Sequence, residues 1–246
     1  MRAGPSLKNY HSSRWGPWWY RHILRKWSRP PFPRLVTGSQ KPDQMNTYDI
    51  CIVGAGVVGC AIARELGRRP WDTPLKIAVL EQRGSPGEET SGRNSGVLHS
   101  GIHEHPCSLK GQLAREGSAL AVSYALQHGI PLLRTGMVIA ISWEDIRRGL
   151  WRELSMLRRL WVNAWKANIR VLFVTSSGLR SWEPNLRAGG GIIIPSVSVI
   201  DSLAFVQSLR ADSEGSGAEF AFNNRVIGID EDATAYIVTT DRQRIR

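Results

Sequence analysis

The sequence predicts an α/β fold with a mostly parallel sheet, because three features follow one another without interruption. A short apolar run rich in β-branched residues, 48–53, has the length of a strand. A glycine-rich turn at 54–59 follows directly and leads into a helix-like run, 60–66. A second apolar run at 75–80 ends on the acid Glu81. Strand, glycine turn, helix and strand in this order make the βαβ unit of a parallel sheet.

The spacing of the glycines predicts a dinucleotide site at this turn. Gly54 permits the tight turn, Gly56 lets the backbone approach a pyrophosphate, and Gly59 lets the helix pack close to the strand. The N-terminus of the helix then offers free N–H groups and a partial positive charge to the diphosphate. Glu81 can accept hydrogen bonds from an adenosine ribose, and its charge disfavours the 2′-phosphate of NADP. The alternative is a glycine turn in an ordinary βα unit. The predicted cofactor-binding residues of this unit are Gly54, Gly56, Val57, Val58, Gly59, Glu81 and Gln82.

The charge of the chain is concentrated at its start. The net charge is +11, of which residues 1–44 carry +8 and the remaining 202 residues only +3. The body of the protein therefore needs no polyanionic partner, and nucleic-acid binding is not expected. The three cysteines lack disulfide or metal spacing, which fits packing residues in a reducing compartment. No stretch approaches the roughly 20 apolar residues that would span a membrane.

Residues 1–44 form a basic extension rich in Trp and Arg, with no settled helical or strand period. One interpretation is an unstructured extension outside the fold, with Met45 as a natural start. A second is an organellar presequence, because the segment is rich in Arg and poor in acids. A third is an arm that touches a membrane surface through its tryptophans.

A long polar loop, 82–102, follows Glu81 where a simple NAD domain would continue into another βαβ unit. Residues 48–102 resemble the D-amino-acid-oxidase-type FAD superfamily. The string from Ser91 to Ile102, SGRNSGVLHSGI, is similar to that of the L-2-hydroxyglutarate dehydrogenase group. The likeness extends over roughly residues 48–240 and continues through 106–110, 128–130, 183–186 and 198–201.

This resemblance implies FAD as the cofactor and gives roles to several side chains. The loop would run along the pyrophosphate and ribityl chain, with His99 near the flavin ring. There His99 would take a proton from a substrate hydroxyl while a hydride is transferred from the substrate C–H to the flavin. The alternative for His99 is a loop histidine that only hydrogen-bonds the backbone. The further cofactor contacts implied are Ser91, Arg93, Asn94 and Ser95 in the loop, and Val226 at the adenine.

The sequence departs from the family after Ile102. Where the family tends to carry an aromatic pair, this chain has His103-Glu104-His105. Three polar, titratable side chains would alter the substrate pocket, which leaves the substrate open. Two histidines at i and i+2 in a loop, without further ligands, do not predict a metal site.

The rest of the chain predicts alternating helices and strands. A helix is expected at 108–130, ending near Gly129, with Leu109, Leu113, Leu120 and Tyr124 on one apolar face. A bent strand at 132–141 precedes a long basic helix, 143–167. That helix would bury a stripe formed by Leu150, Leu154, Leu157, Leu160 and Trp161.

After this helix, strands are expected at 171–174 and 191–194. Asp201 would cap a helix that runs to about Arg210. Three strands then follow at 219–222, 225–230 and 235–240, the last two forming a hairpin.

The expected architecture is a Rossmann-like FAD-binding domain with an interleaved α+β substrate domain, incomplete at the C-terminus. The extension (1–44) would precede the first part of the FAD-binding domain (45–131), a partial substrate domain (132–218) and the return strands (219–246). Because the family fold continues well past Arg246, we expect a fragment of a longer product or a degenerate copy.

The expected activity is FAD-dependent oxidation of a small, L-2-hydroxyglutarate-like 2-hydroxy acid, with an unassigned electron acceptor. The alternatives are an amine- or glycerol-phosphate-oxidising flavoenzyme of the same superfamily, a non-catalytic fragment, and a plain NAD-dependent reductase, which the loop argues against. The expected location is the cytoplasm, or an organelle such as the mitochondrion or a membrane surface if residues 1–44 are a leader.

Overall fold

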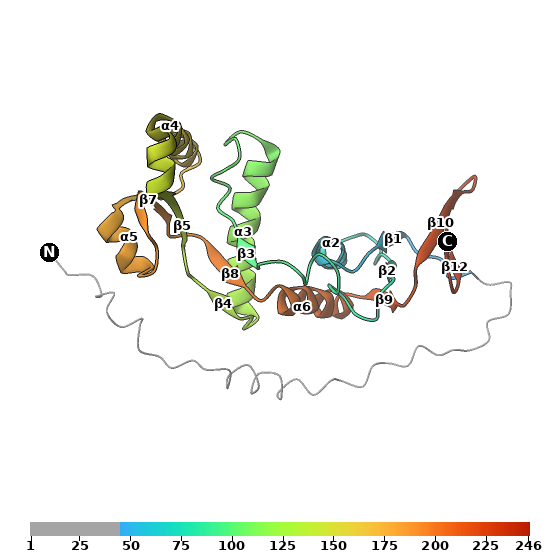
Figure 1. Ribbon diagram of the computed structural model, residues 1–246. Helices are drawn as coiled ribbons and strands as arrows, with labels where there is room; N and C mark the ends of the chain where they lie inside the picture. The colour runs from blue at the N-terminus through green and yellow to red at the C-terminus, as the bar shows by residue number, and fades with distance from the viewer. Residues whose placement is uncertain (1–44) are drawn as a thin grey trace. The chain divides into compact units, whose positions relative to one another are not determined.

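The computed structural model describes residues 45–246 (Figure 1). The expectations for residues 1–44 lie outside these described residues. Within them, no helix combines the length and the apolar character needed to cross a bilayer.

The βαβ unit predicted from the glycine turn is present. Strand β1 (Ile50–Val53) and strand β2 (Ile77–Glu81) pair in parallel, and helix α2 (Val57–Arg68) connects them. Strand β9 (Ala218–Phe222) adds to the other edge of β2, also in parallel, so the sheet order is β1-β2-β9. Every residue of β2 is buried, as expected for the central strand of a parallel sheet covered on both faces. The predicted α/β class is confirmed.

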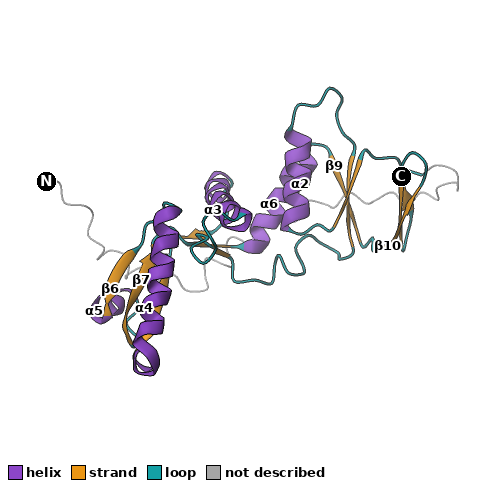
Figure 2. Ribbon diagram, turned by 90° about the horizontal axis from the view of Figure 1, so that it is seen from above, coloured by secondary structure: helices purple, strands orange, loops and turns teal. Residues whose placement is uncertain are grey.

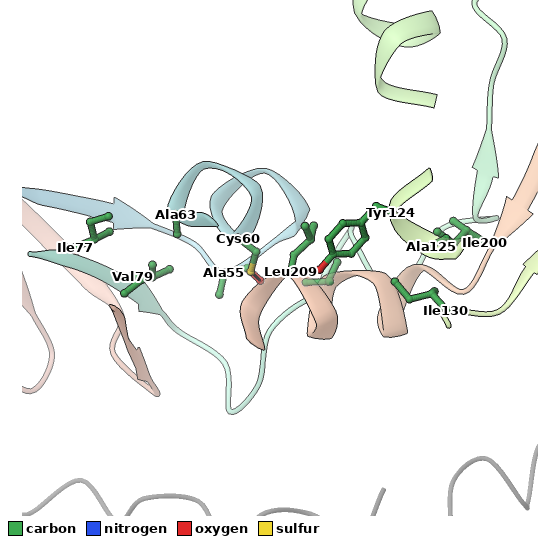
Figure 3. Close-up of a cluster of buried hydrophobic side chains, with 12 residues drawn as sticks. Ala55, Cys60, Ala63, Ile77, Val79, Tyr124, Ala125, Ile130, Ile200 and Leu209 are labelled. Atoms are coloured by element: carbon green, nitrogen blue, oxygen red, sulfur yellow. Dashed lines mark hydrogen bonds between the residues drawn. The ribbon is translucent and has the colours of Figure 1, made fainter. Parts of the chain in front are cut away.

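The main core forms where this sheet meets three helices, α2, α3 (Leu109–Gln127) and α6 (Ser202–Gly215) (Figure 3). Small side chains of α2, Cys60 and Ala63, lie against Ile77 and Val79 of β2 and let the helix approach the sheet closely. Asp201 caps α6 as predicted, since its Oδ1 accepts a hydrogen bond from the Ala204 N–H at 3.0 Å.

The apolar face predicted for α3 is wrong. Leu109, Leu113 and Leu120 do share one stripe, but that stripe is exposed, and only Tyr124 of the predicted set is buried. The buried face is made of small residues, Gly111, Ala121 and Ala125, beside Tyr124. Small side chains allow close packing without a leucine stripe, so hydropathy alone selected the wrong side of this helix. Its predicted end is correct, because Gly129 adopts a φ of +65° and the Ile130 N–H donates to the Ala125 carbonyl.

A second, antiparallel sheet has the order β5-β7-β6. Its strands are β5 (Met137–Ser142), β6 (Leu172–Thr175) and β7 (Ala188–Ile194). Helix α4 (Trp143–Lys166) packs on this sheet, and the short helix α5 (Ser176–Trp182), which the sequence did not predict, follows β6 (Figure 2).

The single bent strand expected at 132–141 is two strands in different sheets. Strand β4 (Leu132–Leu133) pairs with β8 (Ser198–Ile200), whereas β5 pairs with β7. Gly136, with a φ of +66°, provides the change of direction between them. Strand β8 also pairs with β3 (Val97–Leu98), so part of the loop expected at 82–102 is a short strand.

The stripe predicted for α4 is only partly correct. The helix kinks at Gly149, whose φ and ψ are not helical. Leu160 is fully buried and Leu157 packs against the same cluster, whereas Leu150, Leu154 and Trp161 are exposed. The predicted stripe therefore spans two faces of the helix, of which one covers the sheet.

The final hairpin is confirmed. Strand β10 (Val226–Glu231) pairs antiparallel with β11 (Tyr236–Thr240), and β11 pairs with β12 (Arg244–Ile245).

Helix α6 packs mainly against α2, so we propose that the substrate domain ends before α6 rather than at residue 218.

Candidate functional site

The glycine turn between β1 and α2 has the geometry that its spacing predicts. Gly54 adopts a φ of +100°, which L side chains rarely adopt. A Cβ on Gly59 would lie 2.0 Å from the Gly54 carbonyl oxygen, so this position admits only glycine at the observed helix–strand distance. A Cβ on Gly56 would meet the Ser91 Oγ at 2.9 Å, which places the distant loop directly against the turn.

The N-terminus of α2 is suited to a negatively charged group. The N-cap residue, Gly56, has no side chain to cap the helix, and the first turn has no acidic residue. The Val57 N–H donates to Ser91 Oγ at 3.0 Å, and the side chain of Val58 is exposed. First-turn N–H groups have no acceptor within their own helix, so those next to Val57 remain available to an anion.

Glu81 organises the turn as well as ending β2. Its carboxylate is buried and accepts two backbone hydrogen bonds, from Ala55 N–H at Oε2 and from Arg83 N–H at Oε1, both at 2.8 Å. Each carboxylate oxygen has a second acceptor position, so these bonds leave capacity for ribose hydroxyls. Gln82, next in the chain, is exposed.

Asn94 fixes the conformation of the loop. Its amide donates to the carbonyls of Thr90 and Ser91, at 3.1 and 2.7 Å. Its Oδ1 accepts from the Gly96 N–H and from the Ser202 Oγ, both at 2.8 Å. The loop is thus tied to the start of α6. The other two predicted loop contacts, Arg93 and Ser95, are exposed beside it.

His99 lies at the end of this loop, directly after β3, and is exposed. Two polar groups near it were missed by sequence reasoning. Ser100 is buried, and its Oγ lacks a hydrogen-bond partner in the part of the chain that is described; the same holds for the Arg115 Nη1. Arg115 packs on Gly101, where a Cβ would lie 3.4 Å from the Arg115 Cγ. Neither residue belongs to a pattern that the sequence could reveal.

The segment His103-Glu104-His105 has local partners. Glu104 pairs with Lys110 at 2.7 Å, and His105 Nδ1 accepts a hydrogen bond from the Cys107 N–H at 3.3 Å. Among residues 45–246, no cluster of three potential metal-binding side chains occurs.

Val226 is the first residue of β10, two residues after Asn224, which contacts the end of β2. The Asn224 N–H donates to the Glu81 carbonyl at 2.9 Å, and Val226 packs against a small cluster that includes Leu80 and Val238. The fold therefore brings the start of β10 next to the strand that ends on Glu81.

These features have counterparts in known proteins. Residues 49–246 match the family described as FAD dependent oxidoreductase. The chain belongs to this family. Its cofactor is FAD, which agrees with a glycine turn open at the helix N-terminus and a buried acid at the end of β2.

Among relatives, the chain is 28% identical to L-2-hydroxyglutarate dehydrogenase of Escherichia coli (strain K12) over 193 residues, which cover 78% of this chain and 44% of that protein. It is 32% identical to the mitochondrial L-2-hydroxyglutarate dehydrogenase of Homo sapiens over 200 residues, 80% of this chain and 41% of that protein. The chain thus spans less than half the length of these relatives.

Among solved structures, the fold is similar to the dithionite-reduced L-alpha-glycerophosphate oxidase from Mycoplasma pneumoniae with FAD bound. The TM-score is 0.68 at 24% identity, covering 81% of this chain and 51% of that one. At this identity the likeness supports the fold.

Proposed function

We propose that this chain forms the FAD-binding part of an oxidoreductase that acts on a small 2-hydroxy acid similar to L-2-hydroxyglutarate. The observation that carries the proposal is the loop from Ser91 to His99. The Ser91 contact to the Val57 N–H holds the loop against the glycine turn, and four hydrogen bonds of Asn94 fix its conformation and tie it to α6. A plain NAD-binding unit needs no such loop. The names of the relatives support the substrate class.

Different residues of the chain would bind different parts of FAD. The first-turn N–H groups of α2 would bind the pyrophosphate, since they offer donors and a partial positive charge. Glu81 would accept hydrogen bonds from the ribose. The proposed loop contacts are Ser91, Arg93 and Ser95, while Asn94 acts through the loop conformation. Val226 would contact the adenine through its backbone.

The bound flavin supplies the hydride acceptor. His99 would take the proton of the substrate hydroxyl, and the flavin would accept the hydride of the C–H bond. The loss of these two hydrogens converts the alcohol to a carbonyl. An imidazole suits this role because its ordinary pKa lies near neutrality. Its exposed position at the end of the loop leaves it accessible to a substrate.

Arg115 and Ser100 are the groups that we propose for the substrate carboxylate. A carboxylate favours a cationic partner with N–H donors, and the Arg115 guanidinium has an N–H that no residue among 45–246 satisfies. Substitution Arg115→Met should therefore raise KM by about tenfold or more with a smaller effect on kcat. An unchanged KM would exclude Arg115 as this partner.

The absorbance spectrum of the purified 246-residue chain tests the proposal. After addition of FAD and removal of unbound cofactor, we expect flavin bands close to one FAD per chain, bleached anaerobically by L-2-hydroxyglutarate. His99→Gln should keep the bands but slow bleaching by about 10²-fold or more, the usual worth of a positioned base. Asp72→Asn, an exposed residue in the connection between α2 and β2, is the control and should bleach at the wild-type rate.

Two results would contradict the proposal. A protein that stays colourless does not bind FAD as the described residues predict. A coloured protein bleached by sn-glycerol 3-phosphate or glycine, but not by L-2-hydroxyglutarate, is a flavoenzyme of another substrate class.

For the compartment, we propose the cytoplasm. An organelle is the alternative, and the human relative, which is named as mitochondrial, supports that alternative. Fractionation of cells that express the tagged chain distinguishes the two.

A further inference from the structure

Helix α4 carries a stripe of large apolar side chains on an exposed face. After the kink at Gly149, Leu150, Leu154, Trp161 and Trp165 recur at spacings of four, seven and four residues, which places them on one side of a helix. Trp151 lies at the edge of this stripe. The exposed fractions of these five residues range from 43% for Leu154 to 83% for Trp151. We call these five residues the α4 stripe.

The α4 stripe is not the face that holds the helix on its sheet. Leu160 and Ala164 are buried in a cluster with Ile192 and Ile194 of β7, and these residues make the attachment. Figure 2 shows α4 lying alongside the sheet, and its contacts are with β5 and β7. Single exposed apolar residues are common on protein surfaces, but a continuous stripe with three tryptophans indicates a surface that binds something.

The charge around the α4 stripe is positive. Residues 154–182 contain five Lys or Arg and no acid. Arg158 falls within the stripe, and Arg159 and Lys166 are on its polar side; none of the three forms an ion pair among the described residues. By contrast, Arg148 pairs with Glu144 and Arg152 pairs with Glu153. Among residues 45–246, Arg158 is therefore an unpaired cation among the exposed apolar side chains, with Arg159 and Lys166 on the polar side of the same helix.

We propose that the α4 stripe binds the surface of an anionic lipid bilayer. Tryptophan favours the interface between headgroups and acyl chains, and arginine can extend its guanidinium to lipid phosphates while its methylenes stay among apolar groups. Complementary charge is the ground for choosing this partner, because residues 154–182 contain five Lys or Arg and no acid, and Arg158 is exposed among the apolar side chains. In this arrangement α4 would lie parallel to the bilayer surface, with the α4 stripe toward the lipid and Leu160 and Ala164 toward the sheet. The inference rests on α4 alone and does not depend on the proposed reaction.

Vesicle co-sedimentation of the full 246-residue chain tests this proposal. The probes are phosphatidylcholine vesicles with and without 30 mol% phosphatidylglycerol. Binding is expected to the anionic vesicles and to weaken with added salt. Trp161→Gln/Trp165→Gln should lower partitioning by at least about tenfold, and Arg158→Gln/Arg159→Gln by about 30-fold on anionic vesicles. Leu113→Gln/Leu120→Gln, which removes two exposed leucines from α3, is the matched control and should bind like wild type.

Three outcomes would overturn the proposal. The first is a wild-type chain that binds neither vesicle. The second is equal binding by wild type and both α4 variants, which would assign the binding to another part of the chain. The third is concentration-dependent self-association in solution that Trp161→Gln/Trp165→Gln abolishes, which would assign the stripe to a second copy. Circular dichroism and thermal melting of each variant show that a lost signal is not a loss of folding.

Discussion

Substitution Gly59→Ala tests the closest backbone approach in the candidate site. The added Cβ would lie 2.0 Å from the Gly54 carbonyl oxygen and 3.3 Å from the Ile52 Cγ2. A carbon and a carbonyl oxygen in contact lie roughly 3.3 Å apart, so α2 must move by about 1.3 Å. Overpacking of this kind costs about 3 kcal/mol, at the upper end of the usual range because backbone atoms cannot rotate away. The better helix propensity of alanine offsets about 1 kcal/mol, which leaves a loss of about 2 kcal/mol.

Urea unfolding followed by circular dichroism measures this loss, and Gly117→Ala is the matched control. Gly117 lies within α3 with nothing within 4 Å of its Cβ position, so alanine there should stabilise the protein by about 0.5–1 kcal/mol. The two variants are thus expected to move the unfolding midpoint in opposite directions. Gly59→Ala should also weaken FAD retention, because displacement of α2 moves its N-terminus. If Gly59→Ala is as stable as wild type and retains FAD, the close approach of α2 to β1 is wrong.

Three further predictions concern other parts of the fold. Partial burial raises the pKa of Asp212, but hydrogen bonds from Arg64 and Tyr124 outweigh it and leave that pKa lowered. This contribution to stability is present above the unfolded pKa of about 3.9 and is lost as the pH falls through the lowered folded pKa. Asp212→Asn should therefore reduce the urea midpoint at pH 7 but hardly at pH 2, and an equal reduction at both would refute the ionic explanation. Asn94→Ala removes four hydrogen bonds and should cost about 1–3 kcal/mol, make the loop cleavable by protease and weaken FAD binding; a loop as resistant as wild type would contradict its role. Burial raises the pKa of the Cys60 thiol to about 12, whereas Cys107 is exposed, so a thiol reagent at pH 8 should modify Cys107 quickly and Cys60 only after unfolding. Rapid modification of Cys60 in the folded protein would show that α2 does not pack as described.

The sequence by itself determined the βαβ unit and the dinucleotide turn. These depend on local rules, since a glycine at a positive φ, a helix start and a strand end involve residues close in the chain. The Asp201 cap and the final hairpin were predictable for the same reason. The family resemblance implied that Ser91 contacts the FAD phosphates or ribityl hydroxyls, and the structure adds its contact to the Val57 N–H across 34 residues.

Tertiary structure alone decided which faces of the helices are buried. The leucine stripe of α3 obeys helical periodicity and yet is exposed, because small residues on the other side allow a closer approach to the core. The five residues of α4 that were predicted to share one buried face divide between the sheet, which Leu157 and Leu160 contact, and an exposed surface. The Ser100 hydroxyl and the Arg115 Nη1, which lack a partner among residues 45–246, depend on where distant segments pack. Periodicity gives the angle between side chains on one helix, whereas burial depends on the shape of the partner surface, which residues distant in the sequence provide.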